Sequence, residues 1–142
     1  MLEIEQYQQA DGVYFLRPEK ILTEETTVYV IETLKSIYRG SEATYIILNL
    51  ENNYTLPIRK LATDIRSFYR SIPPTNSPMF IAVIVENSMI QVMDSVLKTL
   101  MRREAIQAFN EMSRAKQWLM LERLKQQNVK DIGKIMRNDK PD

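Results

Sequence analysis

Two nearly continuous apolar runs constrain the fold of this chain more than any other feature. TYIILNL occupies residues 44–50, and MFIAVIV occupies residues 79–85. Both runs are short and nearly free of polar alternation, which is typical of strands buried on both faces of a sheet. An amphipathic stretch at helical spacing follows each run. This alternation predicts central strands in a mostly parallel or mixed sheet that helices cover.

Two further pieces of the sheet are predicted outside the central runs. Residues 2–17 are expected to form an antiparallel hairpin, because Asp11-Gly12 is a strong signal for a tight turn between two strands. Pro18 is expected to end the second of these strands. The stretch EAIQAF at 104–109 alternates polar and apolar residues, which predicts a short strand at an edge of the sheet.

Residues suited to helix ends flank the amphipathic stretches. Thr23, Thr55, Ser88 and Asn110 are expected to cap the starts of four helices, and Gly40 to stop the first of them. Residues at helical spacing predict the buried faces. In chain order they are Val28, Ile31, Leu34, Ile37 and Tyr38; Ile58, Leu61, Ile65, Phe68, Tyr69 and Ile72; Val92, Met93, Val96, Leu97 and Leu100; and Met112, Ala115, Trp118, Leu119 and Leu121.

The predicted fold is therefore α/β, with a mixed sheet of about five strands and about four covering helices. A chain of 142 residues suits one such domain. We assign it to residues 1–125 and assign residues 126–142 to a charged C-terminal tail or a weak helix. In that last segment Val129 and Ile132 keep helical spacing, but Gly133 interrupts it among charged neighbours.

The composition excludes most kinds of catalytic site. The chain has no cysteine and no histidine, so thiolate nucleophiles, Ser–His–Asp triads and histidine-ligated metals are absent. Three glycines are too few for a glycine-rich phosphate loop. The 18 Asp and Glu residues show no metal-loop spacing. We expect no enzyme activity, no cofactor and no metal.

Charge and hydropathy indicate a cytoplasmic protein. The N-terminus lacks the apolar core of a signal peptide, and the apolar run at 79–85 is too short to span a bilayer. Residues 1–97 carry 8 Lys/Arg against 12 Asp/Glu, net −4, whereas residues 98–142 carry 11 against 6, net +5. The basic third includes Arg102-Arg103. No known motif or stacking platform accompanies these arginines, so nucleic acid is not an expected partner.

The C-terminal part of the pattern resembles a known family. FNEMSRAKQWL at 109–119 contains a strand ending in Phe109, a capped helix start, Ala115 and then Trp118-Leu119. These features, preceded by the strand at 79–85 and its helix, resemble the SpoIIAA-like proteins, which belong to the class with STAS-type or Sec14-like folds. The resemblance extends over about residues 3–124. We expect the four residues that carry it to be structural anchors: Phe109, Ala115, Trp118 and Leu119.

The resemblance also implies where a switch would lie. In anti-sigma-factor antagonists of the STAS type, a serine within D-S-S-G is phosphorylated at the start of the helix that follows the central strand. The matching place here is ENNYTLP, which lacks D-S-S-G. Thr55 is therefore a candidate phosphosite, with a plain helix cap as the alternative. Asn52, Asn53, Tyr54 and Thr55 are the candidate binding residues, although asparagines also serve as ordinary loop residues.

STAS-type proteins are commonly binding and regulatory modules. We therefore expect a non-catalytic regulatory or protein-interaction module whose partner is another protein, with a homodimer included. The alternative is a lipid or small apolar ligand bound in a pocket between helices and sheet, which Sec14-like relatives suggest.

Overall fold

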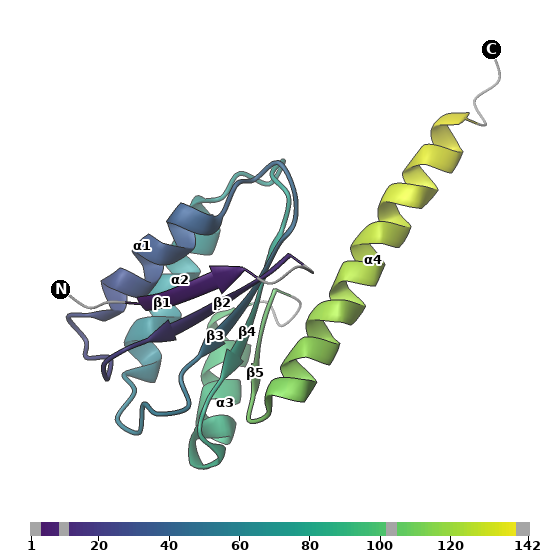
Figure 1. Cartoon of the computed structure of the whole chain (residues 1–142). Helices are drawn as coiled ribbons and strands as arrows, with labels where there is room; N and C mark the ends of the chain where they lie inside the picture. Colours follow the sequence, from purple (N-terminus) through teal and green to yellow (C-terminus); the bar gives the residue numbers. More distant parts are fainter. Residues whose placement is uncertain (1–3, 9–11, 102–104, 139–142) are drawn as a thin grey trace.

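The predicted mixed α/β fold is confirmed. The computed structural model describes residues 4–8, 12–101 and 105–138, the last six of them by their backbone alone. Within these ranges five strands form one sheet in the order β1-β2-β3-β4-β5. β1 is antiparallel to β2, and the other neighbours are parallel. The strands are β1 (Ile4–Gln8), β2 (Val13–Pro18), β3 (Thr44–Asn49), β4 (Met79–Ile84) and β5 (Ile106–Phe109), as Figure 1 shows.

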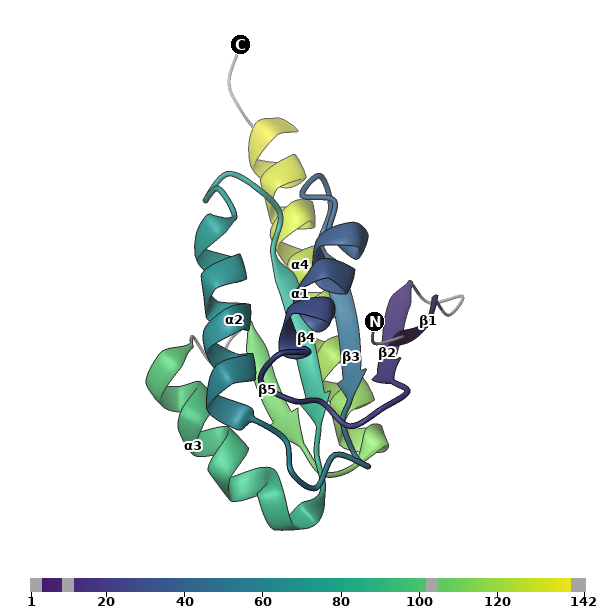
Figure 2. The ribbon, with the colours of Figure 1, turned by 90° about the vertical axis from the view of Figure 1, so that its left-hand side faces the viewer.

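Strand order dictates how the helices are distributed. The chain steps from β2 to β5 in one direction, and parallel connections are right-handed, so all three connecting helices lie on the same face of the sheet (Figure 2). The helix after β5 lies on the opposite face (Figure 1). The helices of the described chain are α1 (Thr27–Ile37), α2 (Ile58–Ser71), α3 (Ile90–Leu100), which follows the 3-10 turn η1 (Asn87–Met89), and α4 (Met112–Asn138).

The two predicted central strands are central and contribute to two cores. Residues 44–48 of β3 and all of β4 are buried. Because side chains alternate across a strand, each strand feeds both faces. The core beneath α1, α2 and α3 includes Leu16, Ile46, Leu48, Ile81 and Val83. The core beneath α4 includes Phe15, Tyr45, Ile47, Phe80, Ala82 and Leu119.

The outer strands also follow the sequence. β1 pairs with β2, and Gly12 takes a φ of +86°, which suits a hairpin turn. Leu2 and Asp11 of the predicted hairpin lie outside the described residues. β5 pairs with β4 at the far edge of the described sheet, as predicted. The Arg102-Arg103 pair also lies outside the described residues.

The first helix starts later than predicted. Thr23 does not precede helical residues directly; it opens a turn in which the Thr26 and Thr27 amides both donate to its carbonyl oxygen. The Thr23 amide donates in return to Thr26 Oγ1 at 2.7 Å. α1 begins only at Thr27 and ends at Ile37. The threonine-rich sequence thus satisfies its polar groups in a local turn before the helix begins.

Gly40 turns the chain beyond the helix rather than stopping it. The residue after α1, Tyr38, is already extended, and its amide donates to the Leu34 carbonyl oxygen. Gly40 follows with a φ of +78°, and a Cβ there would lie 2.7 Å from Asn76 Nδ2. Both its backbone angle and this close approach therefore require glycine.

The other three predicted caps are wrong as well. α2 begins at Ile58, and no side-chain hydrogen bond caps its described first turn, so Thr55 is not its cap. Ser88 lies within η1, ahead of α3. Asn110 lies two residues before α4 begins, and its amide donates to Asn87 Oδ1 at 2.7 Å. In each case a local turn uses the residues that the sequence pattern assigned to the helix start.

Three residues predicted to be buried are exposed instead. Val28 is 46% exposed, Val92 54% and Leu121 55%. Each lies beside the true buried face of its helix, so a small rotation of the apolar stripe suffices to expose it. Val30 fills the position that Val28 was expected to take, and it is fully buried.

α4 continues without a break across the predicted boundary at residue 125. It runs for 27 residues, and its second half projects past the sheet (Figure 1). Gly133, expected to interrupt the pattern, lies inside this helix. Local hydrogen bonds are enough to continue a helix through one glycine, at a cost of about 1 kcal/mol.

Candidate functional site

Asn53 is a structural residue of the β3–α2 loop. Its side chain is only 4% exposed, and Oδ1 accepts the Leu22 amide at 2.6 Å. Its own amide donates to the Leu50 carbonyl oxygen at 3.1 Å. The side chain therefore ties the loop after β3 to the segment between β2 and α1, and it is unavailable to a ligand.

A polar cleft opens beside this loop, where the carboxyl ends of β2 and β3 meet. Its volume is about 350 Å³, and Asn52 and Asn53 belong to its wall, whereas Tyr54 and Thr55 do not. Acids and bases are mixed around it, and Arg17 pairs with Glu5 across β1 and β2 at 3.0 Å. The lining residues are Glu5, Arg17, Pro18, Glu19, Lys20, Ile21, Asn49, Glu51, Asn52 and Asn53.

The predicted binding residues therefore separate into two groups. Asn52 is exposed at the polar cleft. Tyr54, 67% exposed, and Thr55, also exposed, lie outside the cleft on the approach to α2. The four residues are close in sequence, but the structure does not converge them on one site. The mixed charge of the cleft selects neither an anion nor a cation.

The predicted anchors do converge, where α4 packs on the sheet. Ala115 is fully buried and Leu119 is 2% exposed. Trp118 is partly buried, with its ring 5.8 Å from the Phe109 ring and 6.3 Å from the Phe80 ring. Trp118 therefore fixes α4 across β4 and β5, as an anchor should.

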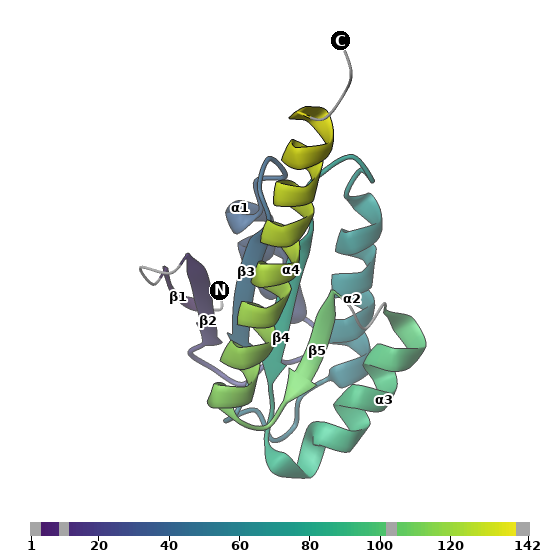
Figure 3. The ribbon, with the colours of Figure 1, turned by 90° about the vertical axis from the view of Figure 1, so that its right-hand side faces the viewer.

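α4 covers only part of its face of the sheet. It packs mainly on β4, with β5 and β3 on either side, and β1 and β2 extend beside it (Figure 3). Side chains rather than a helix cover β2 there. The Tyr7 ring stacks on the Phe15 ring at 5.0 Å, and Lys116 Nζ lies 5.5 Å from the centre of the Phe15 ring. We call Tyr7, Val13 and Phe15 the β1–β2 strip.

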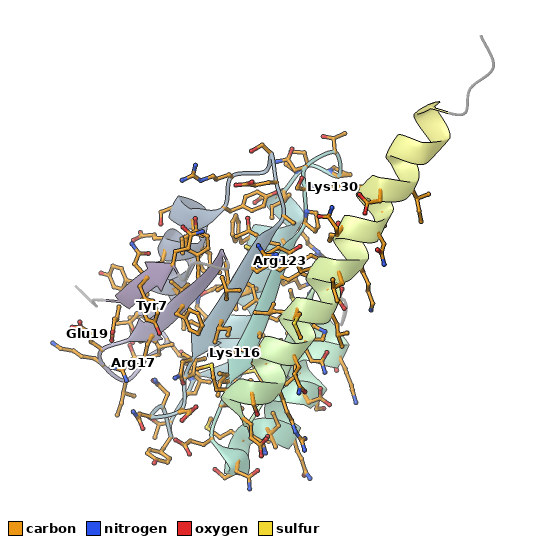
Figure 4. All side chains as sticks on the ribbon, turned by 45° about the vertical axis from the view of Figure 1, so that its right-hand side comes forward. Tyr7, Arg17, Glu19, Lys116, Arg123 and Lys130 are labelled. Carbon is orange, nitrogen blue, oxygen red and sulfur yellow. The ribbon has the colours of Figure 1, made fainter. Side chains whose placement is uncertain are left out.

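Two cations from α4 reach over this part of the sheet. Lys116 and Arg123 lie seven residues apart, on the same side of the helix (Figure 4). The Arg123 guanidinium lies 5.7 Å from the centre of the Tyr45 ring. Burial raises the pKa of the Tyr45 hydroxyl, and the charge of Arg123 partly offsets this shift. The cations rest on aromatic faces, where ring quadrupoles stabilise them.

An apolar cavity of about 260 Å³ lies between these cations and the sheet. Its floor is apolar, from β2, β3 and Leu119, and Lys116, Gln117 and Arg123 border it. Met120 also lines it and is 57% exposed. The cavity therefore joins the β1–β2 strip to the outer surface of α4.

The outer surface of α4 carries an apolar patch that the sequence analysis missed. Ala115, Leu119 and Glu122 mark the side of the helix that faces the sheet. Met120, Leu121 and Leu124 lie on the opposite side, each between 54% and 57% exposed. We call these three residues the outward α4 patch. Val129 and Ile132 add exposed apolar surface farther along the helix.

Helical spacing did contain a signal for this patch. Leu121 was assigned to the core because it is close in spacing to Trp118, yet it lies on the far side of Leu119. Only the packing of Ala115 and Leu119 on β4 shows which side of the helix is buried. The heptad spacing of Lys116 and Arg123 was also readable, but not what lay beneath them.

Two searched features are absent from the described residues. No cluster of three or more Asp or Glu side chains there is placed to hold a metal ion. In the same ranges, no helix combines the length and hydrophobicity needed to cross a bilayer. Comparison with known proteins identifies no relative, because no family model, curated protein or solved structure matches the chain.

Proposed function

We propose that this chain is a non-catalytic, SpoIIAA-like interaction module of the STAS class that binds a protein partner through α4. The outward α4 patch carries the proposal, because Met120, Leu121 and Leu124 form one apolar surface facing away from their own sheet. Contiguous exposed apolar surface commonly marks a binding site. The sheet order and the packing of Trp118 on Phe109 support the family assignment. The cysteine-free composition supports a place in the cytoplasm.

Capture from extracts of the native cells tests this proposal. Immobilised wild-type chain should retain a partner that the Leu121→Glu/Leu124→Glu variant does not retain. Val92→Glu on α3 is the matched control, since Val92 is 54% exposed, like Leu124, but lies on the opposite face of the sheet. Equal capture by both variants would place the binding surface elsewhere on the molecule.

Phosphorylation of Thr55 is a regulatory proposal within the same function. Thr55 is exposed and lies three residues before α2 begins. A phosphate there would add about −1.5 to −2 charge near the positive end of the α2 dipole. Phosphopeptide mapping of protein from its native cells should find modified Thr55. Consistent recovery of the unmodified peptide would end this proposal.

A second candidate function is binding of a small anionic amphiphile in the 260 Å³ cavity. The observation that favours it is an apolar floor beside two cations, Lys116 and Arg123. The volume lies just below the roughly 300–1,000 Å³ typical of ligand pockets, so the ligand would be small. Titration with decanoate, followed by amide NMR shifts, should perturb residues 116–123. Lys116→Gln should weaken binding, whereas Lys35→Gln on α1 should not.

A further inference from the structure

We propose that the partner of α4 is a second copy of this chain, whose own α4 lies over the β1–β2 strip. The inference rests on the proposed interaction function and names its partner. In this arrangement the two sheets face each other, and the two α4 helices lie side by side between them. Each helix packs on its own sheet on one side and on the other copy's sheet on its opposite side.

The sheet leaves space for one additional helix. α4 packs on β3, β4 and β5, and β1 and β2 continue the sheet beyond it (Figure 3). Neighbouring strands lie about 4.8 Å apart, and packed helix axes lie about 8–10 Å apart. Two strands therefore provide the width of one helix. Tyr7, 52% exposed on this strip, offers an aromatic ring for such a helix to cover.

The two surfaces involved are one continuous apolar area. Met120 belongs to the outward α4 patch and lines the same cavity as Val13 and Phe15 of the strip. A helix placed against the strip would therefore contact the edge of that patch as well. Under a two-fold axis each patch meets the other copy's strip, and each strip meets the other copy's patch. This is the self-complementarity that a two-fold interface requires.

Charge complementarity favours a second copy over an unrelated partner. α4 carries seven Lys/Arg against two Asp/Glu, net +5, whereas residues 1–97 carry 8 against 12, net −4. The arrangement places each basic helix against the acidic body of the other copy. The whole chain has a formal charge of only +1, so long-range repulsion between copies is weak.

The oligomeric state tests the inference directly. Light scattering or sedimentation should give wild-type chain a mass twice the 16.7 kDa of one copy. Leu121→Glu/Leu124→Glu should give the mass of a single copy, with an unchanged circular dichroism spectrum because neither side chain faces its own sheet. The matched control Val92→Glu should remain a dimer. Loss of two buried leucines should raise the dissociation constant by about 100-fold or more.

Cross-linking tests which surfaces meet. The chain has no cysteine, so single cysteines can be introduced without background. A Tyr7→Cys chain mixed with a Leu124→Cys chain should give a mixed dimer with a short bis-maleimide reagent. Val92→Cys in place of Leu124→Cys should not, because α3 lies on the other face of the sheet. Equal cross-linking from both positions would overturn the arrangement.

Failure of this inference is distinguishable from failure of the proposed function. Wild-type chain that stays monomeric at about 100 μM would overturn the second copy as partner. So would a dimer that Leu121→Glu/Leu124→Glu leaves intact. If that monomer still captured another protein, and the double variant did not, the proposed function would stand with a different partner. A monomer that captures nothing would overturn both.

Discussion

A single buried amide joins two loops at one end of the sheet. Asn53 Oδ1 accepts the amide of Leu22, a residue only 1% exposed. Asn53→Ala should lower the free energy of unfolding by about 1–3 kcal/mol, because the Leu22 amide would remain buried without its acceptor. Urea denaturation measures the change.

The neighbouring asparagine supplies the control for this prediction. Asn52 is exposed, so Asn52→Ala should change the free energy of unfolding by no more than about 0.5 kcal/mol. Equal losses from the two substitutions would show that the Asn53 hydrogen bond contributes nothing specific. Sequence reasoning treated both asparagines alike, because nothing in a local pattern shows that one side chain reaches a residue 31 positions earlier.

Thr55 yields an opposite expectation. Because α2 begins at Ile58, Thr55→Ala should change the free energy of unfolding by less than about 0.5 kcal/mol. A true N-cap would lose about 1 kcal/mol. Thermal and urea unfolding would separate the two values, and a loss near 1 kcal/mol would restore Thr55 as a cap.

At the scale of elements, Tyr69 fastens α2 to the sheet. Its hydroxyl donates to the Met79 carbonyl oxygen at 2.7 Å and lies 3.1 Å from the Ala105 carbonyl oxygen, beside β4 and β5. Burial, assisted by the nearby Tyr38, raises the pKa of Tyr69 far above its ordinary value. The hydroxyl therefore stays protonated in the folded protein at pH values where an unfolded chain releases its proton.

This shift predicts a loss of stability in alkali. Below about pH 10 both states hold the Tyr69 proton, and its effect on stability is constant. Above that pH only the unfolded chain releases it, so the free energy of unfolding falls by up to about 1.4 kcal/mol per pH unit. Urea denaturation at increasing pH should show a smaller loss for Tyr69→Phe than for wild type. Parallel pH profiles would contradict the prediction.

The elements differ in how far their sequences define them. β3 and β4 were predictable because strands buried on both faces are apolar without interruption. The helix starts were not, since Thr23, Ser88 and Asn110 make equally good hydrogen bonds in turns or with another loop. The apolar stripes were right in period but rotated by one residue at Val28 and Leu121. Rotation is set by the surface against which a helix packs.

At the scale of the whole molecule, the uneven charge makes association sensitive to salt. If the basic α4 of each copy lies against the acidic body of the other, raising the salt concentration should weaken the dimer. Screening over about 10 Å at 0.1 M salt, and about 3 Å at 1 M, removes most of this attraction. Sedimentation across that range measures the dissociation constant. A constant or tighter dimer at high salt would mean that apolar contact alone holds it.

The sequence by itself determined the α/β class, the two central strands and the N-terminal hairpin, because these depend on local periodicity and turn residues. Only the tertiary structure decided which side of α4 is buried, and hence that Met120, Leu121 and Leu124 face outward. It also separated Asn53, which binds Leu22, from its exposed neighbours. Both outcomes depend on contacts between segments distant in the chain, and spacing within one segment carries no information about what lies opposite it.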